Sequence, residues 1–261
     1  MKLIYASALL FFISCNSSGY KEPIKIQGAY KMLSSNVKTD KTDSTYTSAN
    51  QLKIYTDSYM MYANINSPDS ISAFGIGTYS MENDTIKERV IFNAYDSTKS
   101  TTTSTFTLII EKTAKGYKQV IPNMPGQDNQ PMKLTEEYES IGTADTSPLD
   151  GAWKQTSAFT VMGKDTSNAI NNQYKIYYAG HVIWGHNYTD SLNKLHTGIG
   201  FGKFVMKGND KVTESLEAST YYQVRGKDID IDIEMKGTDK FKQTITNFDS
   251  SKNVEIYQRL K

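Results

Sequence analysis

Polar and apolar side chains alternate residue by residue over Asp228–Glu234. The stretch reads Asp-Ile-Asp-Ile-Asp-Ile-Glu, so four carboxylates fall on one face and three isoleucines on the other. Successive side chains of a β-strand point to opposite faces, and a pairing shifted by one residue would bury the carboxylates. The pattern predicts a half-buried strand of fixed register. Met235–Thr238 has turn composition, and the next strand would bring Lys240 and Lys242 to the acidic face.

Short segments of the same kind recur along the whole chain. They are rich in Ile, Val, Thr, Tyr and Phe and are separated by Gly, Asn, Asp and Ser, a composition typical of strands and turns. The clearest are Leu52–Asp57, Tyr59–Ile65, Phe106–Lys112, His181–His186, Asp228–Glu234 and Phe241–Thr246. No stretch keeps a helical period over about three turns, so we expect an all-β protein.

The second half of the chain repeats the first. Gly28–Lys31 reads Gly-Ala-Tyr-Lys, and Gly151–Lys154, about 120 residues later, reads Gly-Ala-Trp-Lys. Further matches follow in the same order: Gln51–Tyr55 with Gln173–Tyr177, Gly75–Tyr79 with Gly200–Phe204, Asn83, Asp84 and Glu88 with Asn209, Asp210 and Glu214, Tyr117–Gln119 with Phe241–Gln243, and Glu136 and Tyr138 with Glu255 and Tyr257. The chain therefore contains two copies of one domain.

The spacing sets the domain boundaries. We expect copies at 28–141 and 151–261, joined by a linker at 142–150 that is rich in Thr, Ser, Asp and Pro. Roughly eight strands per copy are enough to close a small barrel, whose interior is either filled or holds one ligand. The predicted fold is two tandem small antiparallel up-and-down β-barrels.

Composition and charge exclude several classes of protein. The chain has 261 residues, of which 11% are aromatic and 22% charged, which is not the composition of a disordered chain. A net charge of +1 gives no long-range electrostatic reason for nucleic acid or an anionic membrane surface as partner. The single cysteine excludes an internal disulfide framework and a cysteine-rich metal site.

The chain begins with the pattern of a secretion signal. Residues 1–14 contain Lys2, an apolar run too short to span a bilayer and then Ser14, which predicts a signal peptide. The only cysteine, Cys15, follows directly. An ordinary signal peptide with an unrelated cysteine is the alternative to a functional Cys15.

The four residues Phe12–Cys15 resemble a bacterial lipobox. The resemblance implies cleavage before Cys15, acylation of its thiol and amine, and a lipid-anchored tether at 15–27. No acidic cluster follows Cys15, whereas such a cluster marks surface export in Bacteroidetes-type lipoproteins. We therefore expect a lipoprotein of the bacterial outer membrane that faces the periplasm.

The opening Gly-Ala-Trp-Lys of the second copy resembles the Gly-x-Trp start of lipocalins and other calycin barrels. Together with the copy length and the Gly-x-Gly-x-aromatic strand, it is similar to small lipocalin-like lipoproteins of Bacteroidetes. The resemblance implies that Trp153 plugs the closed end of the barrel and that Arg259 packs over it. Tyr30 and Ser140 take these positions in the first copy, so the pair occurs together or not at all.

The three histidines all lie in the second copy. His181 and His186 are five residues apart, so on one continuous strand they point to opposite faces and do not share a metal without a bulge. A haem or zinc ligand among them and His196 is the alternative that we weighed, but closed zinc sites need three or four converging ligands. We expect neither a metal nor a cofactor.

Matched polar and aromatic residues are the remaining candidates. Glu88 and Glu214 occupy equivalent places, where each either orients a ligand inside its barrel or lies in solvent. The aromatic pairs suit either core filling or a cavity wall. These pairs are Tyr55 with Tyr177 and Tyr62 with Trp184.

The leading hypothesis is a binding protein that holds a small, partly apolar molecule in at least one barrel, preferably the second. The residues expected to contact the ligand are Tyr177, Trp184, His181 and Glu214 in the second copy and Tyr55, Tyr62 and Glu88 in the first. The alternative is a structural or partner-binding lipoprotein with filled barrels. No Ser/His/Asp set or nucleophile elbow supports an enzyme, so we expect no catalytic residue.

Overall fold

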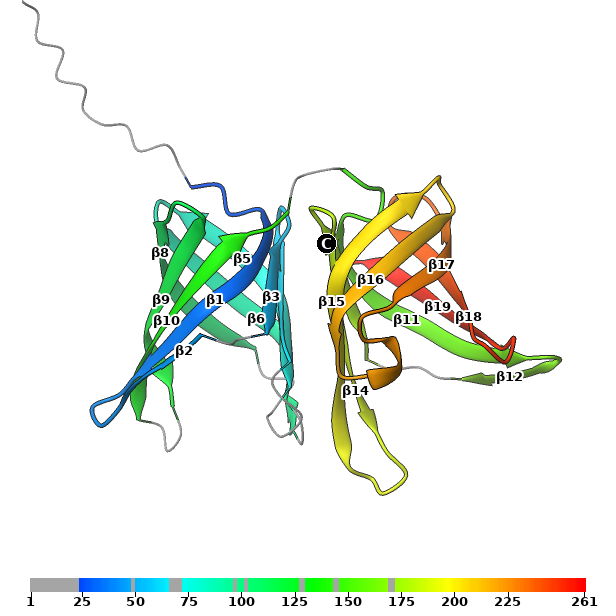
Figure 1. Cartoon of the computed structure of the whole chain (residues 1–261), viewed down its shortest axis with the longest axis horizontal. Helices are drawn as coiled ribbons and strands as arrows, with labels where there is room; N and C mark the ends of the chain where they lie inside the picture. The colour runs from blue at the N-terminus through cyan, green and yellow to red at the C-terminus, as the bar shows by residue number, and fades with distance from the viewer. Residues whose placement is uncertain are drawn as a thin grey trace, which may run out of the picture.

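The chain folds into two closed β-barrels, one after the other (Figure 1). The computed structural model describes residues 24–47, 50–65, 72–95, 98–100, 103–126, 130–142, 146–168 and 172–261. Each barrel has eight antiparallel strands, which confirms the expected all-β class and the two tandem barrels. The predicted signal peptide and Cys15 lie outside the described residues. Among the residues described, no helix is long and apolar enough to cross a membrane.

The first barrel extends from β1 to β10. Its strands are β1 (Gly28–Lys38), β2 (Asp43–Tyr46), β3 (Gln51–Tyr55), β4 (Tyr59–Asn64), β5 (Ala73–Glu82), β6 (Thr85–Tyr95), β7 (Thr98–Ser100), β8 (Ser104–Lys112), β9 (Gly116–Pro125) and β10 (Pro131–Ser140). The barrel closes because β10 pairs with β1. Two short strands are additions to it: β2 pairs with the end of β1, and β7 pairs with the end of β6.

The second barrel repeats this plan. Its strands are β11 (Gly151–Met162), β12 (Asp165–Asn168), β13 (Tyr174–Tyr178), β14 (His181–Thr189), β15 (Leu195–Lys207), β16 (Lys211–Ser219), β17 (Asp228–Met235), β18 (Lys240–Thr246) and β19 (Lys252–Arg259). Here β19 closes the barrel on β11, and β12 extends β11 as β2 extends β1. A short 3-10 helix, η2 (Tyr222–Val224), lies between β16 and β17.

Breaks in strand register fall at equivalent places in the two barrels. They lie between Met32 and Ser34, Gln155 and Ser157, Ile76 and Gly77, and Phe201 and Gly202. A Cβ atom on Gly202 would lie 2.0 Å from the carbonyl oxygen of Ser215, and the matching Gly77 has the same restriction. Glycine is therefore required where the strand bulges, and the bulge bends the strand around the barrel.

The alternating strand β17 has the expected orientation. Ile231 and Ile233 are buried inside the barrel, and the carboxylates are exposed. Lys242 pairs with Glu234 across the hairpin, as the alternation predicts. Lysines of the same outer surface pair with two of the other carboxylates: Lys207 with Asp230 and Lys211 with Asp232.

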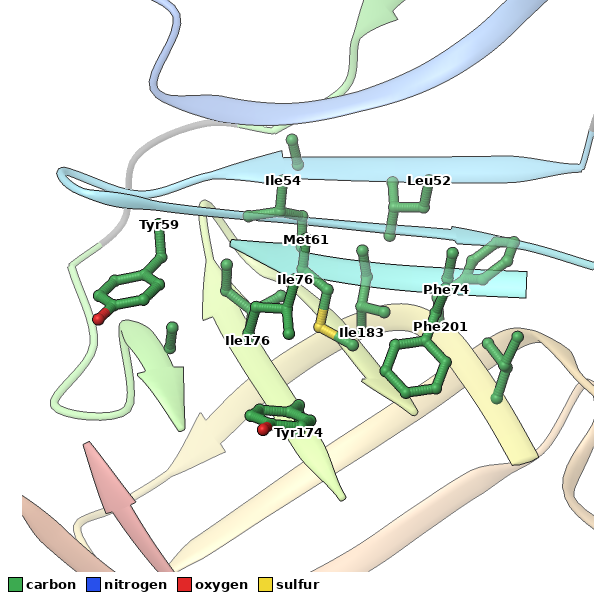
Figure 2. Close-up of a cluster of buried hydrophobic side chains, with 14 of the residues drawn as sticks. Leu52, Ile54, Tyr59, Met61, Phe74, Ile76, Tyr174, Ile176, Ile183 and Phe201 are labelled. Atoms are coloured by element: carbon green, nitrogen blue, oxygen red, sulfur yellow. The ribbon is translucent and has the colours of Figure 1, made fainter. Parts of the chain in front are cut away.

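The outer faces of the two barrels pack together and form one continuous apolar core (Figure 2). Side chains on β3, β4 and β5 meet side chains on β13, β14 and β15. Among them are Leu52, Ile54, Met61, Phe74 and Ile76 from the first barrel and Tyr174, Ile176, Ile183 and Phe201 from the second. Gly185 leaves room for the ring of Phe74, because a Cβ atom there would lie 2.7 Å from it.

Equivalent strands face each other across this contact. Strand β3 meets β13, β4 meets β14, and β5 meets β15. An arrangement in which the same patch on two copies meets itself is that of an isologous dimer. The duplicated chain thus reproduces, within one polypeptide, the two-fold contact of a homodimer.

Candidate functional site

Both barrels contain the same interior network of seven polar side chains, all of them buried except Glu255, which is half-buried. The equivalent pairs are Gln51 and Gln173, Lys53 and Lys175, Tyr55 and Tyr177, Glu88 and Glu214, Gln119 and Gln243, Glu136 and Glu255, and Tyr138 and Tyr257. Every one of these pairs belongs to a match that the sequence repeat contains. The residues that recur between the two copies are therefore largely the residues of this interior network.

In the second barrel the network is centred on a lysine. The ammonium Nζ of Lys175 lies 2.9 Å from Glu214 Oε1, 3.0 Å from Gln243 Oε1 and 3.2 Å from the hydroxyl of Tyr177. The Tyr177 hydroxyl donates to the same Glu214 oxygen. Lys175 and Glu214 are each at most 2% exposed, so this is a fully buried ion pair whose partners are also hydrogen-bonded.

A second carboxylate extends the network. Gln243 Nε2 donates to Glu255 Oε2 at 2.7 Å, and the hydroxyl of Tyr257 donates to the same oxygen. Gln173 donates in turn to the Tyr257 hydroxyl. Each barrel therefore holds two carboxylates and one lysine, although Glu88 and Glu214 themselves lie in different barrels.

The first barrel has the same contacts. Lys53 lies 2.7 Å from Glu88 and 3.2 Å from Gln119, and Gln119 and Tyr138 donate to Glu136. Burial raises the pKa of Glu136 above its usual range. Because both copies keep the network, we interpret it first as the structural centre of the barrel.

The second barrel contains an open cavity of about 610 Å³ above this network. Its floor is formed by Gln173, Lys175, Glu214, Gln243 and Glu255. One wall is aromatic. The remaining lining is mixed: its apolar side chains are Val224, Ile229, Ile231, Ile245 and Phe248, and its polar ones are Gln223, Lys227, Asp228, Asp230, Thr246, Asn247 and Asn253. A concave site of this size with few polar groups at its base is the usual form of a small-molecule site.

The aromatic wall, which we call the aromatic shelf, consists of Trp184, His186 and Tyr221. The rings of Trp184 and His186 are nearly parallel, at 11° and 6.1 Å between centroids, and Tyr221 is inclined 26° to Trp184 at 5.9 Å. The His186 Nε2 atom and the Tyr221 hydroxyl are 2.8 Å apart and share a hydrogen bond. The shelf presents flat π-surface at the cavity, beside the carboxylates of its floor.

Two glycines of β15 make room for the shelf. A Cβ atom on Gly200 would lie 2.2 Å from the indole of Trp184, and one on Gly198 would lie 2.5 Å from His186 Nε2. The rings therefore lie flat against bare backbone. In the first barrel Tyr62 lies over Gly75 in the same way. Asn64 occupies the position equivalent to His186, so the first barrel has no imidazole ring at this place.

Burial keeps the imidazole of the shelf uncharged. Desolvation lowers the pKa of His186 to about 4. His186 is therefore neutral near pH 7 and adds no positive charge to the cavity.

The structure brings together some of the residues expected at the site. Trp184 and Glu214 line the cavity, and Tyr177 lies beneath its floor, bonded to Glu214. His181 does not reach the cavity: it shares the strand face of Ile183, which packs against the first barrel, and its Nδ1 lies 2.9 Å from the carbonyl oxygen of Ala179. Alternation along β14 places His181 and Trp184 on opposite faces.

The expected residues of the first copy lie in the other barrel. Tyr55 and Glu88 belong to its network, where Tyr55 donates to Glu88, and Tyr62 lies over Gly75. Glu88 and Glu214 are both buried and paired with lysine. Of the two alternatives considered from the sequence, each glutamate therefore lies inside its barrel and not in solvent.

Sequence reasoning missed most of the residues that line the cavity. Among them are Lys175, Gln243 and Glu255 on the floor and Tyr221 on the aromatic shelf. The first three were visible as identities between the two copies, at Lys53, Gln119 and Glu136. A lysine and two carboxylates that recur together inside a barrel indicate an interior network, because unpaired buried charges are too costly to keep.

The plug residues lie at the other end of the barrel from the cavity. The guanidinium carbon of Arg259 is 4.0 Å from the centre of the Trp153 ring, and the Trp153 indole N–H donates to the carbonyl of Leu149 at 2.7 Å. Arg259 also donates to the carbonyls of Thr238, at 2.8 Å, and of Pro148, at 3.1 Å. Tyr30 and Ser140 are the corresponding strand partners in the first barrel.

The histidines do not converge. His181 faces the first barrel, His186 belongs to the aromatic shelf, and His196 lies 2.7 Å from Asp190 at the β14–β15 hairpin. Within the described ranges, no group of three or more His, Cys, Asp or Glu residues is placed to hold a metal ion.

Comparison with known proteins adds little. No protein-family model and no curated protein matches the chain. The chain is similar to a crystal structure of a protein of unknown function from the DUF3598 family of Nostoc punctiforme, with 9% identity, a TM-score of 0.25 and coverage of 90% of this chain and 96% of that one. It is also similar to StfQ, a di-domain ARO/CYC from the steffimycin biosynthetic pathway, with 7% identity, a TM-score of 0.17 and coverage of 79% and 72%. Both TM-scores are too low for these likenesses to carry an argument.

Proposed function

We propose that this protein binds a small, partly apolar molecule in the cavity of the second barrel. The observation that carries the proposal is the aromatic shelf. The interior network is common to both copies and is explained by the barrel itself, whereas His186 replaces Asn64 and Trp184 replaces Tyr62. Apolar wall area would supply most of the affinity, and the polar floor would select the ligand.

We further propose that the protein works as a lipoprotein of the outer membrane, attached through Cys15 and facing the periplasm. Residues 24–27 lead into the start of β1 (Figure 1), at the end of the first barrel that is equivalent to the Trp153 and Arg259 end of the second. The stretch from Cys15 to Ile24 has a reach of about 30 Å when extended. The closed ends would therefore face the anchoring membrane, and the cavity would open away from it.

Native mass spectrometry of the protein purified from its own cell envelope tests the binding function. We expect a small-molecule mass that stays with the wild-type chain and is lost in Trp184→Ala. The matched control is Tyr62→Ala, which removes the equivalent ring from the first barrel and should leave the bound mass unchanged. A wild-type chain with no bound mass, in repeated preparations, contradicts the proposal.

The anchor has its own test. Cys15→Ser should release the protein from membranes into the soluble fraction, because the acylated thiol would be absent. Continued membrane attachment of Cys15→Ser contradicts acylation at this residue.

A structural or partner-binding role is the second candidate function. Its support is a set of exposed apolar side chains of the second barrel: Leu192 and Phe248 on loops and Tyr222 in η2. In the first barrel, the stacked rings of Tyr117 and Tyr138 with Tyr30 and Tyr55 fill much of the interior. A protein that co-purifies with the wild-type chain and is lost in Phe248→Ser would favour this role.

A further inference from the structure

We propose that the ligand of the second barrel is a cationic amine with an apolar or aromatic body. The ammonium group would lie against the floor of the cavity, and the body would lie against the aromatic shelf. This inference rests on the proposed binding function and adds the chemical class of the ligand.

The lysine on the floor has no hydrogen bond left to give. An ammonium group carries three N–H donors, and Lys175 has three acceptors within 3.2 Å: Glu214, Gln243 and Tyr177. An anionic ligand would therefore find no free donor on Lys175.

The carboxylates on the floor, by contrast, each keep one oxygen available. Glu214 uses Oε1 for both Lys175 and Tyr177, and Glu255 uses Oε2 for both of its donors. Within the part of the chain that the structure describes, Glu214 Oε2 and Glu255 Oε1 accept no hydrogen bond; Glu214 is 2% exposed and Glu255 is half-buried. Both residues line the cavity, so the floor offers acceptors to a ligand that brings donors.

The charge of the cavity also favours a cationic ligand. The floor has two carboxylates against one ammonium, and the neutral His186 does not change that balance. At the mouth, Lys227 is balanced by the adjacent Asp228. Asp230 also borders the cavity, but its carboxylate is bonded to Lys207 and Thr213 on the outer face. An ionised floor thus leaves one negative charge for the ligand to neutralise.

The aromatic shelf suits the same ligand. The face of an indole attracts a nearby cation and also stacks on apolar or aromatic groups. Trp184 stands on the wall beside Glu214 and Glu255, so an amine could meet carboxylate and ring together. A charged donor and an oppositely charged acceptor form the stronger class of hydrogen bond.

Isothermal titration calorimetry with three matched compounds tests the inference. The probes are 2-phenylethylamine, 2-phenylethanol and 3-phenylpropanoate, titrated at pH 7 into the full-length protein in a non-ionic detergent. We expect the amine to bind about tenfold or more tightly than the alcohol, and the carboxylate to bind weakest. These titrations use the unaltered chain, so the test does not depend on a variant folding.

Glu255→Gln adds a second readout. It should weaken the amine about tenfold and leave the alcohol nearly unchanged, because glutamine keeps an acceptor for Tyr257 but removes the charge. Glu136→Gln makes the same change in the first barrel and should leave all three affinities unaltered.

The outcomes separate the two proposals. Equal or tighter binding of the alcohol or the carboxylate overturns the amine inference and leaves the binding function standing. No binding of any of the three probes overturns the amine inference; joined to an empty wild-type chain in native mass spectrometry, it overturns the binding function as well.

Discussion

The indole of Trp184 occupies the space that a side chain on Gly200 would need. An added Cβ atom would lie 2.2 Å from the ring, well inside van der Waals contact. Trp184 and Gly200 are partners on adjacent strands, so the glycine fixes how flat the ring lies against the barrel wall. The width of the cavity depends on this pair.

Gly200→Ala should therefore act on both stability and binding. The methyl group pushes the indole toward the cavity, and overpacking of this kind lowers the free energy of unfolding by about 1–3 kcal/mol. Urea denaturation measures the loss of stability, and native mass spectrometry measures retention of the ligand. Gly75→Ala is the control, because it disturbs Tyr62 in the first barrel. It should lower stability similarly but keep the bound molecule.

Arg259→Ala should destabilise the closed end of the second barrel. The guanidinium lies over Trp153 and donates to several backbone carbonyls, which lose their donors in the variant. We expect the free energy of unfolding to fall by about 2–4 kcal/mol in chemical denaturation. Ser140→Ala, at the equivalent position of the first barrel, should change it by less than about 0.5 kcal/mol. Equal effects of the two variants would contradict the plug.

Lys175→Met should be among the most damaging substitutions in the chain. It leaves the carboxylate of Glu214 buried without its counter-charge, at a cost of about 3–5 kcal/mol. The double variant Lys175→Met/Glu214→Gln should recover a large part of that loss, since neither charge remains. A double-mutant cycle in urea measures the coupling, and an additive result would contradict a paired network.

His186 should make stability depend on pH in mildly acidic solution. Its pKa falls from 6.5 in the unfolded chain to about 4 in the fold, because burial disfavours the charged ring. The unfolded chain then binds the proton first, so stability is lost as pH falls from about 6.5 to about 4, by about 3 kcal/mol in total. Above pH 6.5 both states are neutral and the effect vanishes.

Comparison with His186→Asn isolates this contribution. Asparagine is the residue of the first barrel at this place, Asn64, and it does not titrate. We compare the unfolding free energies of wild type and His186→Asn at pH 7.5 and at pH 4.5. Between these two pH values the wild type should lose stability relative to His186→Asn, by most of the predicted loss of about 3 kcal/mol. A difference that is the same at both pH values would show that the ring is not buried as described.

The two barrels should unfold together. Their outer faces share one apolar core, so calorimetry of the wild type should give a single cooperative transition. Ile183→Lys places a charge in that core and should separate the transition into two. Val205→Lys, on an exposed position of β15 in the same barrel, should leave one transition. Two transitions in the wild type would contradict the shared core.

The strand pattern predicted the fold but not which face of each strand is inside. In Gln51–Tyr55 the polar residues Gln51 and Lys53 point into the barrel, and the apolar Leu52 and Ile54 point outward. Alternation alone identifies two faces, and ordinary burial would have put the apolar one inside. Leu52 and Ile54 contact apolar side chains of the second barrel, and the sequence around them does not indicate this contact.

The cavity could not be predicted from the sequence, because it too depends on contacts between distant segments. Trp184 and Glu214 were identifiable as candidates, but an open space depends on the summed volumes of side chains from many strands. His181 lies outside the cavity because it is three residues before Trp184 on the same strand, which puts the two side chains on opposite faces. The pairing of Trp153 with Arg259 was expected from the resemblance to calycin barrels; in the structure the two residues are strand partners at the two ends of one copy.

Strands β3, β4 and β5 pack on β13, β14 and β15 within a single chain, so the two halves of this contact can differ in sequence. In a true homodimer every substitution appears twice, so a residue that opens space in one subunit weakens both. Here a change can be made once. One half can remain tightly filled and hold the pair together, while the other gives up packing for room inside.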